Sequence, residues 1–172
     1  MFILRDKDDL KMKKIYLICL IGMVGFCLAT IQAIACSCYW KGPFLAVAKE
    51  APLVVRGKIL RHHPGKSPAM DVLVFETLSG GLLDSGLTIQ MGDGMHCRPM
   101  LEIFPPDTEW ILAINGPGSK AGNGLAISHC GEYWLKVENG SVVGSIDGDQ
   151  NQVTRMPLEE FKNRFLNLHL KE

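Results

Sequence analysis

The stretch Glu109-Trp110-Ile111-Leu112-Ala113-Ile114-Asn115 is the clearest strand in the sequence and decides the fold class. It is rich in apolar and branched side chains, and the breaker Pro105-Pro106 precedes it. Such runs favour an extended, buried conformation. Residues 116–124 are rich in glycine, so we predict that the strand enters a long hairpin tip and that the chain returns through residues 125–130.

Other strand-like runs, separated by turn residues, lie on both sides of this one. We predict them over residues 53–60, 71–78, 87–91, 133–137 and 141–146. A polar turn at residues 62–68 is expected to end the first run, and an Asn139-Gly140 turn joins the last two into a hairpin. Short strands at near-even spacing favour a small barrel or sandwich. With no internal repeat or linker, the sequence predicts one mostly β domain.

Two helices are expected beside the strands. Pro43 suits the first turn of a short helix over residues 44–50, in which Phe44, Val47 and Ala48 face one way. Residues 158–169 form an amphipathic helical pattern. Its apolar positions recur at helical spacing and comprise Leu158, Phe161, Phe165 and Leu168. We predict that this C-terminal helix covers an open end of the sheet.

Residues 1–35 have the three parts of a secretory signal peptide. A basic region precedes an apolar run at residues 15–28, and Ala33-Ile34-Ala35 supplies the small residues found before a cleavage site. The apolar run is shorter than the about 20 residues of a membrane span. We predict cleavage after Ala35, as in an exported bacterial protein, which leaves residues 36–172 as one secreted or periplasmic domain. An uncleaved anchor and lipidation of Cys36 are the alternatives, and lipidation would tether the protein to a membrane.

The charge and motif content of the predicted mature chain exclude several classes of function. Its 137 residues carry 13 basic and 15 acidic side chains, with no basic stripe. Nucleic-acid-binding proteins instead carry basic patches, so we predict no nucleic-acid partner. The sequence lacks a G-x-S-x-G elbow and an H-E-x-x-H zinc motif, and residues 116–124 lack the Lys-Ser/Thr of a phosphate loop. We therefore predict that the protein is not an enzyme and that it has no catalytic residue and no cofactor.

Six cysteines occur in the sequence, and two of them leave with the predicted signal peptide. The four that remain are Cys36, Cys38, Cys97 and Cys130. An even number in an exported chain indicates disulfides, with three possible pairings. A bond between Cys36 and Cys38 would close a strained ring, so we expect each of them to pair with a distant cysteine. If all four stay reduced, the alternative is a zinc or copper site with His96 and His129.

Cleavage after Ala35 would make Cys36 the first residue of the mature protein. An α-amine has a pKa of about 7.7 to 8.0, so a useful fraction is neutral at physiological pH. The amine nitrogen and the carbonyl oxygen of one residue form a five-membered chelate with a metal ion. Disulfides from Cys36 and Cys38 would hold this chelate rigid, so that little entropy is lost on binding. The Ser37 side chain would then point to a specificity pocket beside the metal.

Three parts of the sequence resemble one family. They are the start Cys36-Ser37-Cys38, the run Leu53-Val54-Val55-Arg56-Gly57-Lys58, and Trp110-Ile111-Leu112-Ala113 with its return to His129-Cys130. They are similar to the C-x-C start, the V-I-R-A-K strand, and the Y-L-I-A-G and H-I-T-x-C segments of the tissue inhibitors of metalloproteinases. The resemblance implies a netrin-like OB-fold domain, a five-stranded barrel with a short N-terminal helix and a C-terminal amphipathic helix.

The same resemblance implies disulfides from Cys36 to Cys97 and from Cys38 to Cys130. It also implies that the amine and carbonyl of Cys36 chelate the catalytic zinc of a target metallopeptidase, while Ser37 enters the primed-side pocket. The inhibitory ridge would then consist of Cys36, Ser37, Cys38 and Tyr39. On this interpretation the protein holds no metal of its own, because the zinc belongs to the target.

Three features depart from the family pattern. Lys49 lies near the place of the first cysteine of the family's third disulfide, and Tyr39-Trp40 replaces a small residue and a proline after the second cysteine. The separate cysteine-rich C-terminal domain of the animal inhibitors has no counterpart, so the resemblance is to the N-terminal inhibitory module. We therefore predict a metalloendopeptidase inhibitor whose partner is a zinc metallopeptidase. The alternatives are a non-inhibitory netrin-like binding module and a Cys/His metal-binding module.

Overall fold

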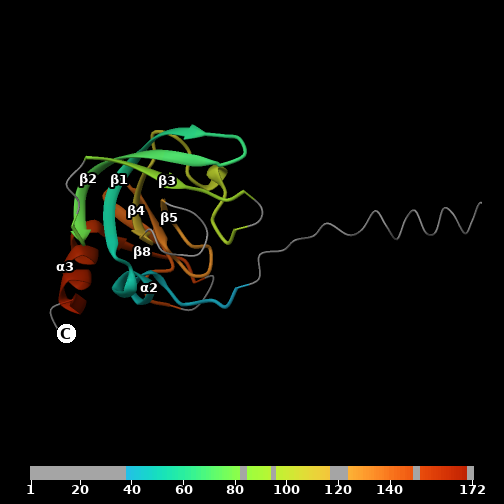
Figure 1. Ribbon diagram of the computed structural model, residues 1–172. Coiled ribbons are helices and arrows are strands. Elements are labelled where there is room, and N and C mark those ends of the chain that lie inside the picture. The colour runs from blue at the N-terminus through green and yellow to red at the C-terminus, as the bar shows by residue number, and fades with distance from the viewer. Residues whose placement is uncertain (1–37, 82–84, 94–95, 117–123, 149–151, 170–172) are drawn as a thin grey trace, which may run out of the picture. The chain divides into compact units, whose positions relative to one another are not determined.

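The computed structural model describes residues 38–81, 85–93, 96–116, 124–148 and 152–169 (Figure 1). The chain divides into two units, Met1–Ala35 and Cys36–Glu172, and all described residues belong to the second. The predicted signal peptide, Cys36 and Ser37 lie outside the described residues, as does most of the predicted glycine-rich tip. No helix among the described residues is long and apolar enough to cross a membrane.

Eight strands in the described part of the chain form a single sheet, in the order β5-β3-β2-β1-β4-β6-β7-β8. Their bounds are β1 Leu53–His63, β2 Ala69–Ser79, β3 Gly86–Gln90, β4 Glu109–Ile114, β5 Leu125–Ala126, β6 Trp134–Glu138, β7 Ser141–Gly144 and β8 Thr154–Pro157. Neighbouring strands are antiparallel except β3 and β5, which run parallel. The prediction of a mostly β fold is confirmed.

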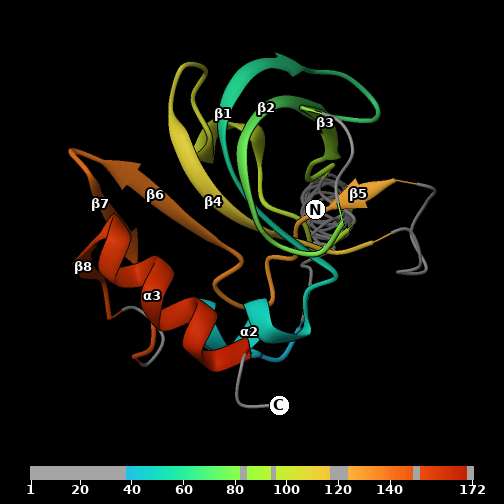
Figure 2. The same cartoon turned by 90° about the vertical axis from the view of Figure 1, so that its left-hand side faces the viewer.

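The strand predicted first, β4, lies in the middle of this sheet, between β1 and β6. Five consecutive residues of β4, from Trp110 to Ile114, are buried. Successive side chains of a strand point to opposite faces, so both faces of β4 are covered. Figure 2 shows how this arises: β1 to β4 curl around a common interior, while β6, β7 and β8 extend away toward the C-terminal helix.

The two predicted helices are confirmed as α2 (Phe44–Glu50) and α3 (Leu158–His169). The rings of Phe44 in α2 and Phe161 in α3 meet edge to face, with centroids 5.8 Å apart, and both are fully buried. The first N–H groups of a helix lack partners within it. In α2 they donate to carbonyl groups after β7, from Phe44 to Ser145 (2.9 Å) and from Leu45 to Ile146 (2.9 Å). The start of α2 is therefore anchored to the end of the β6–β7 hairpin.

The structure corrects the predicted turn at residues 62–68, because β1 continues through His63 and β2 already begins at Ala69. Both histidines of this stretch have partners that no local sequence pattern indicates. His62 Nε2 lies 2.7 Å from the Phe104 carbonyl oxygen, and His63 Nε2 lies 2.9 Å from Asp71 Oδ2. The backbone pairing of β1 with β2 reaches the same two histidines, with His62 opposite Met70 and His63 opposite Ala69.

The last three strands of the sheet differ in how well they were predicted. The hairpin of β6 and β7 is confirmed, and its turn residues Asn139 and Gly140 have φ of 52° and 71°. This positive-φ pair is typical of the turn type that suits the twist of a hairpin. The edge strand β8 was not predicted, because its four residues include a proline and only one large apolar side chain.

The predicted five-stranded barrel is not confirmed, since the eight strands form a sheet that does not close into a barrel. The difference arises because β6 pairs along β4 and carries β7 and β8 with it. One antiparallel bridge does connect the end of β4 to β5: the Asn115 N–H donates to the Ala126 carbonyl at 2.8 Å. Asn115 and Ala126, which precede and follow the predicted glycine-rich tip in the sequence, therefore lie side by side.

Gly57 marks a close approach of β1 and β2. A methyl group at this position would lie 2.7 Å from the Leu73 carbonyl oxygen and 2.8 Å from Val72 Cγ1. The pairing register also shifts between Arg56 and Gly57, which is typical of a β-bulge. Any side chain here would force the backbones of the two strands apart, so the position requires glycine.

We expect Gly57→Ala to lower the free energy of unfolding by about 2 to 3 kcal/mol, because β1 and β2 must separate to admit the methyl group. Gly86→Ala in β3 is the matched control, since nothing lies within 4 Å of its added methyl group. Urea unfolding followed by tryptophan fluorescence measures both variants. Equal stability of the two variants would show that the β1–β2 approach is not a constraint.

A polar cluster around Asp71 connects β1, β2 and β3. Asp71 Oδ2 accepts hydrogen bonds from Arg61 Nε (2.6 Å) and His63 Nε2 (2.9 Å), and Oδ1 accepts one from the Thr88 hydroxyl (2.9 Å). The hydrogen bond from His63, followed by those from Arg61 and Thr88, lowers the pKa of Asp71 from 3.8 to about 2. The ionised carboxylate therefore stabilises the fold above the unfolded-state pKa, and this contribution is lost as the pH falls through about 2.

We expect Asp71→Asn to lower the free energy of unfolding at pH 7 by about 1 to 2 kcal/mol, because the exposed Arg61 partner is partly screened by water. The difference from the unmodified protein should shrink as the pH falls from 4 to 2, where Asp71 itself takes up a proton. Asp147→Asn is the control, since Asp147 pairs with Arg164 at an exposed site, where ion pairs contribute little. A deficit for Asp71→Asn that stays constant down to pH 2 in urea titrations would contradict the role of the charge.

Candidate functional site

Three segments that are far apart in sequence meet at the start of the described chain. They are residues 38–42, 96–98 and 128–132, and backbone hydrogen bonds connect them. The Lys41 N–H donates to the Cys130 carbonyl at 2.8 Å, and the Glu132 N–H donates to the Gly42 carbonyl at 3.0 Å. The His129 N–H donates to the Cys97 carbonyl at 2.9 Å. Backbone hydrogen bonds therefore join the three segments independently of the side chains of the cysteines.

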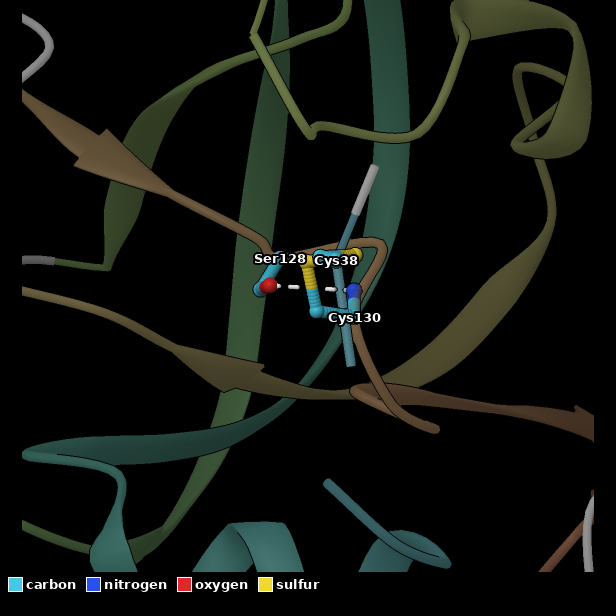
Figure 3. Close-up of a disulfide and its surroundings, with 3 residues drawn as sticks. All are labelled: Cys38, Ser128 and Cys130. Carbon is cyan, nitrogen blue, oxygen red and sulfur yellow. Dashed lines mark hydrogen bonds between the residues drawn. A yellow bond between two sulfur atoms is a disulfide. The ribbon is translucent and has the colours of Figure 1, made fainter. Parts of the chain in front are cut away.

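A disulfide joins Cys38 to Cys130, which are 92 residues apart in sequence and 5.6 Å apart at Cα. That Cα distance is within the usual range for a disulfide. Figure 3 shows the Ser128 hydroxyl beside the bond, where its oxygen accepts the Cys130 N–H at 3.1 Å. The pairing is the one that the family resemblance implies, and it attaches the predicted N-terminal segment to the residues that follow β5.

Cys97 completes a compact group of sulfur atoms. The Sγ atoms of Cys38, Cys97 and Cys130 all lie within 4.8 Å of one another, and Cys97 is also disulfide-bonded. The partner expected from the resemblance, Cys36, lies outside the described residues, so the pairing of Cys36 with Cys97 stays a prediction. Three sulfur atoms at this spacing would also suit a soft metal ion. A metal, however, binds thiolates, and the bond between Cys38 and Cys130 leaves neither of them as a thiolate.

The two histidines of the alternative metal site are engaged elsewhere. The His96 backbone N–H donates to Asp93 Oδ1 at 3.0 Å, and its ring Nδ1 lies 2.7 Å from Asp93 Oδ2. The His129 ring stacks on Trp134, with centroids 5.8 Å apart and planes 21° apart. Within the described ranges, neither histidine belongs to the group of candidate metal ligands around the three cysteines. The structure therefore does not bring together the set of cysteines and histidines that the sequence suggested.

The segment after Cys38 presents an aromatic side chain to solvent. Tyr39 is 90% exposed, and Cys38 beside it is exposed as well. This tyrosine lies between two attachments, the disulfide at Cys38 and the hydrogen bond from Lys41 to Cys130. A large aromatic residue held in water by a fixed backbone is a candidate contact for another protein, because tyrosine is enriched in protein interfaces.

A cavity of about 210 Å³ adjoins the cysteine group. Its lining consists of residues 96–98, Asn115 and residues 126–128. Sequence reasoning missed this cavity and the pair of Asp93 and His96 beside it. No local pattern indicated the cavity, since its lining residues come together through the pairing of β5 with β3 and with the end of β4.

Two ionisable residues that follow Cys130 in the sequence, Glu132 and Tyr133, contribute to the fold. Burial raises the pKa of Glu132, and a hydrogen bond with the Ser145 backbone opposes that rise. Burial also raises the pKa of Tyr133, and the negative charge of Glu50 adds to the effect. Neither residue lines the cavity. Glu132 instead supports the loop at Ser145 that anchors the start of α2.

Comparison with known proteins adds no family to this description. No protein-family model matches the chain, and no curated protein matches it. The resemblance to the tissue inhibitors of metalloproteinases therefore stays a prediction that depends on the quoted residues.

We expect the double variant Cys38→Ser/Cys130→Ser to lose about 3 to 4 kcal/mol of unfolding free energy, because the disulfide no longer restricts the long loop in the unfolded chain. Both cysteines are replaced so that neither is left to pair wrongly with Cys97. Ser128→Ala, which removes only the acceptor of the Cys130 N–H, should cost about 1 kcal/mol. Urea denaturation of the oxidised proteins tests this. A loss below 1 kcal/mol in the double variant would mean that the backbone hydrogen bonds alone hold the segment.

Proposed function

We propose that this protein is a metalloendopeptidase inhibitor. In this proposal the mature chain begins at Cys36, whose amine and carbonyl chelate the catalytic zinc of a target metallopeptidase. Ser37 enters the pocket beside the zinc, and Cys38 and Tyr39 complete the inhibitory ridge. The observation that carries the proposal is the attachment of residues 38–41 to Cys130 by a disulfide and a backbone hydrogen bond, with Tyr39 left exposed between them.

This attachment supports inhibition through the entropy of binding. A free chain terminus would lose much of its conformational freedom in the cleft of a peptidase, whereas a terminus that is already fixed loses little. Catalytic zinc sites keep a coordination position open for water or substrate. The neutral fraction of an α-amine can occupy such a position near neutral pH. The second proposed disulfide, from Cys36 to Cys97, would extend the fixed region to the chelating residue itself.

The strand arrangement supports the netrin-like part of the proposal. OB-folds are five-stranded Greek-key barrels that are partly open. Here β5-β3-β2-β1-β4 are consecutive in the sheet, and the bridge between Asn115 and Ala126 brings the first and last of these five strands together. We propose that β1 to β5 correspond to an OB-fold and that β6, β7, β8 and α3 extend it.

The oxidised cysteines support a location outside the cytoplasm. Disulfides persist in oxidising compartments and are rare in the cytosol. Together with the signal-like residues 1–35, they lead us to propose secretion or export to the periplasm. The target would then be an extracytoplasmic zinc peptidase, and the membrane would be involved only if Cys36 carried a lipid.

A non-inhibitory netrin-like binding module is the second candidate, and exposed Tyr39 is the observation that favours it. An exposed aromatic residue on a fixed segment suits contact with many kinds of protein surface. The two candidates differ in their need for the amine, because only the inhibitor requires Cys36 to be the first residue. A Cys/His metal-binding module has less support, since the described cysteines are disulfide-bonded.

One alanine added before Cys36 should weaken inhibition at least about 100-fold, equivalent to about 2.8 kcal/mol, because the chelating amine becomes a peptide nitrogen. The extended and the unmodified proteins are compared by intact mass, disulfide map and inhibition of a panel of zinc endopeptidases on fluorogenic peptides. The same alanine added after Glu172 is the control and should change nothing. Equal inhibition by both extended proteins would exclude chelation by the terminus.

A further inference from the structure

We propose that the three-sulfur group is a redox-operated release for the N-terminal segment. In this device Cys97, once reduced, displaces Cys38 from its bond with Cys130. The chemistry depends only on the arrangement of the sulfur atoms, while its consequence for inhibition rests on the function proposed above. The N-terminal segment would thus be held when the protein is oxidised and released when a dithiol reduces it.

The geometry brings the reacting atoms together before any reaction. Cys97 Sγ lies within 4.8 Å of both sulfur atoms of the Cys38–Cys130 disulfide. The Cys97 backbone is fixed in this place, because its carbonyl accepts the His129 N–H at 2.9 Å. Cys97 also lines the cavity of about 210 Å³. Attack within one molecule needs no encounter, which raises its rate by a large factor.

Two observations identify Cys130 as the sulfur that is attacked and Cys38 as the one that leaves. Cys38 is exposed, so water stabilises its thiolate, and the better-stabilised thiolate leaves faster. Cys97 and Cys130 also belong to segments that a backbone hydrogen bond already joins. A new bond between Cys97 and Cys130 therefore joins two segments that this hydrogen bond already connects.

The steps balance in atoms and electrons. A dithiol reductant gives two electrons and two protons to the disulfide of Cys97 and becomes a cyclic disulfide, while Cys97 and its partner cysteine both become thiols. Loss of the Cys97 proton gives a thiolate, which attacks Cys130 Sγ. The bond between Cys97 and Cys130 forms, the bond between Cys38 and Cys130 breaks, and the electron pair leaves on Cys38, which then takes up a proton. The exchange itself consumes no electrons.

One equivalent of dithiol would therefore release the N-terminal segment. If Cys97 is paired with Cys36 as proposed, reduction frees Cys36 and the exchange frees Cys38. The new bond between Cys97 and Cys130 keeps the segments at residues 96–98 and 128–132 joined. The hydrogen bond from Lys41 to Cys130 then becomes the first attachment along the chain, so the residues before it, including Tyr39, lose their covalent support.

The test is a disulfide map of the exported full-length protein after limited reduction. The protein is treated with one equivalent of dithiothreitol at pH 8 without oxygen, quenched with acid, alkylated with N-ethylmaleimide and digested. We expect a linked Cys97–Cys130 peptide and alkylated Cys38. Alkylated Cys97 with the Cys38–Cys130 bond intact would overturn the proposal, and so would alkylation of both Cys38 and Cys130.

The double variant Cys36→Ser/Cys97→Ser shows whether Cys97 is the attacking group, because Cys97→Ser alone would leave its proposed partner Cys36 as a second thiol. When both proteins are quenched after the same short time, alkylation of Cys38 in the variant should be at least about tenfold lower, because the reductant must then open the Cys38–Cys130 bond directly. Equal alkylation of Cys38 in this variant would overturn the proposal. Circular dichroism of both proteins before reduction verifies that the comparison is between folded states.

Inhibition is measured separately, so that failures of the two proposals are distinguished. If the exchange occurs but the oxidised protein inhibits no zinc peptidase, the proposed function fails and the exchange stands. If the oxidised protein inhibits and the Cys38–Cys130 bond survives limited reduction, the release fails and the function stands. When both hold, inhibition should be lost in step with alkylation of Cys38.

Discussion

The bond between Cys38 and Cys130 is the constraint on which the position of the N-terminal segment depends. Residues 38–43 contain little that is buried, so the hydrophobic effect alone holds this segment weakly. The disulfide instead attaches it to the chain that follows β5, and hydrogen bonds at Lys41 and Gly42 continue the attachment as far as the start of α2. Helix α2 in turn is anchored at its N-terminus by carbonyl groups that follow β7. The segment and the helix are therefore fixed together against one end of the sheet.

Patterns that act over a few residues allowed the sequence to predict part of this fold. The apolar run of β4, the helical spacing in α3 and the Asn139-Gly140 turn all depend on neighbours along the chain, and all three were predicted correctly. The extension of β1 was missed because its histidines bond to Phe104 and Asp71, which no local pattern connects to them. Strand β8 was missed for the same reason, since only its pairing with β7 makes it a strand. The order of strands in the sheet depends on such distant contacts throughout.

The candidate site was predictable in chemistry but not in geometry. The even number of cysteines indicated disulfides, and the resemblance then selected a pairing that includes Cys38 with Cys130. Counting left three pairings open, because spacing along the chain does not say which segments meet. The cavity next to Cys97 could not have been predicted, since it forms where the end of β4, the segment at residues 126–128 and residues 96–98 come together.

The N-terminal segment is attached in two ways, by a disulfide and by backbone hydrogen bonds. Of the two, the disulfide alone depends on the redox state of the medium. The hydrogen bonds at Lys41, Gly42 and Cys97 join backbone atoms, so an exchange of sulfur bonds leaves their donors and acceptors chemically unchanged. Exposed Tyr39 and Cys38 precede Lys41, and within the described residues the disulfide is the covalent attachment beside them. A part of the chain that is rigid through a single exposed covalent bond is rigid only in an oxidising medium. The disulfide thus contributes both to the stability of the domain and to the rigidity of its exposed tip, whereas the backbone hydrogen bonds contribute to the domain alone.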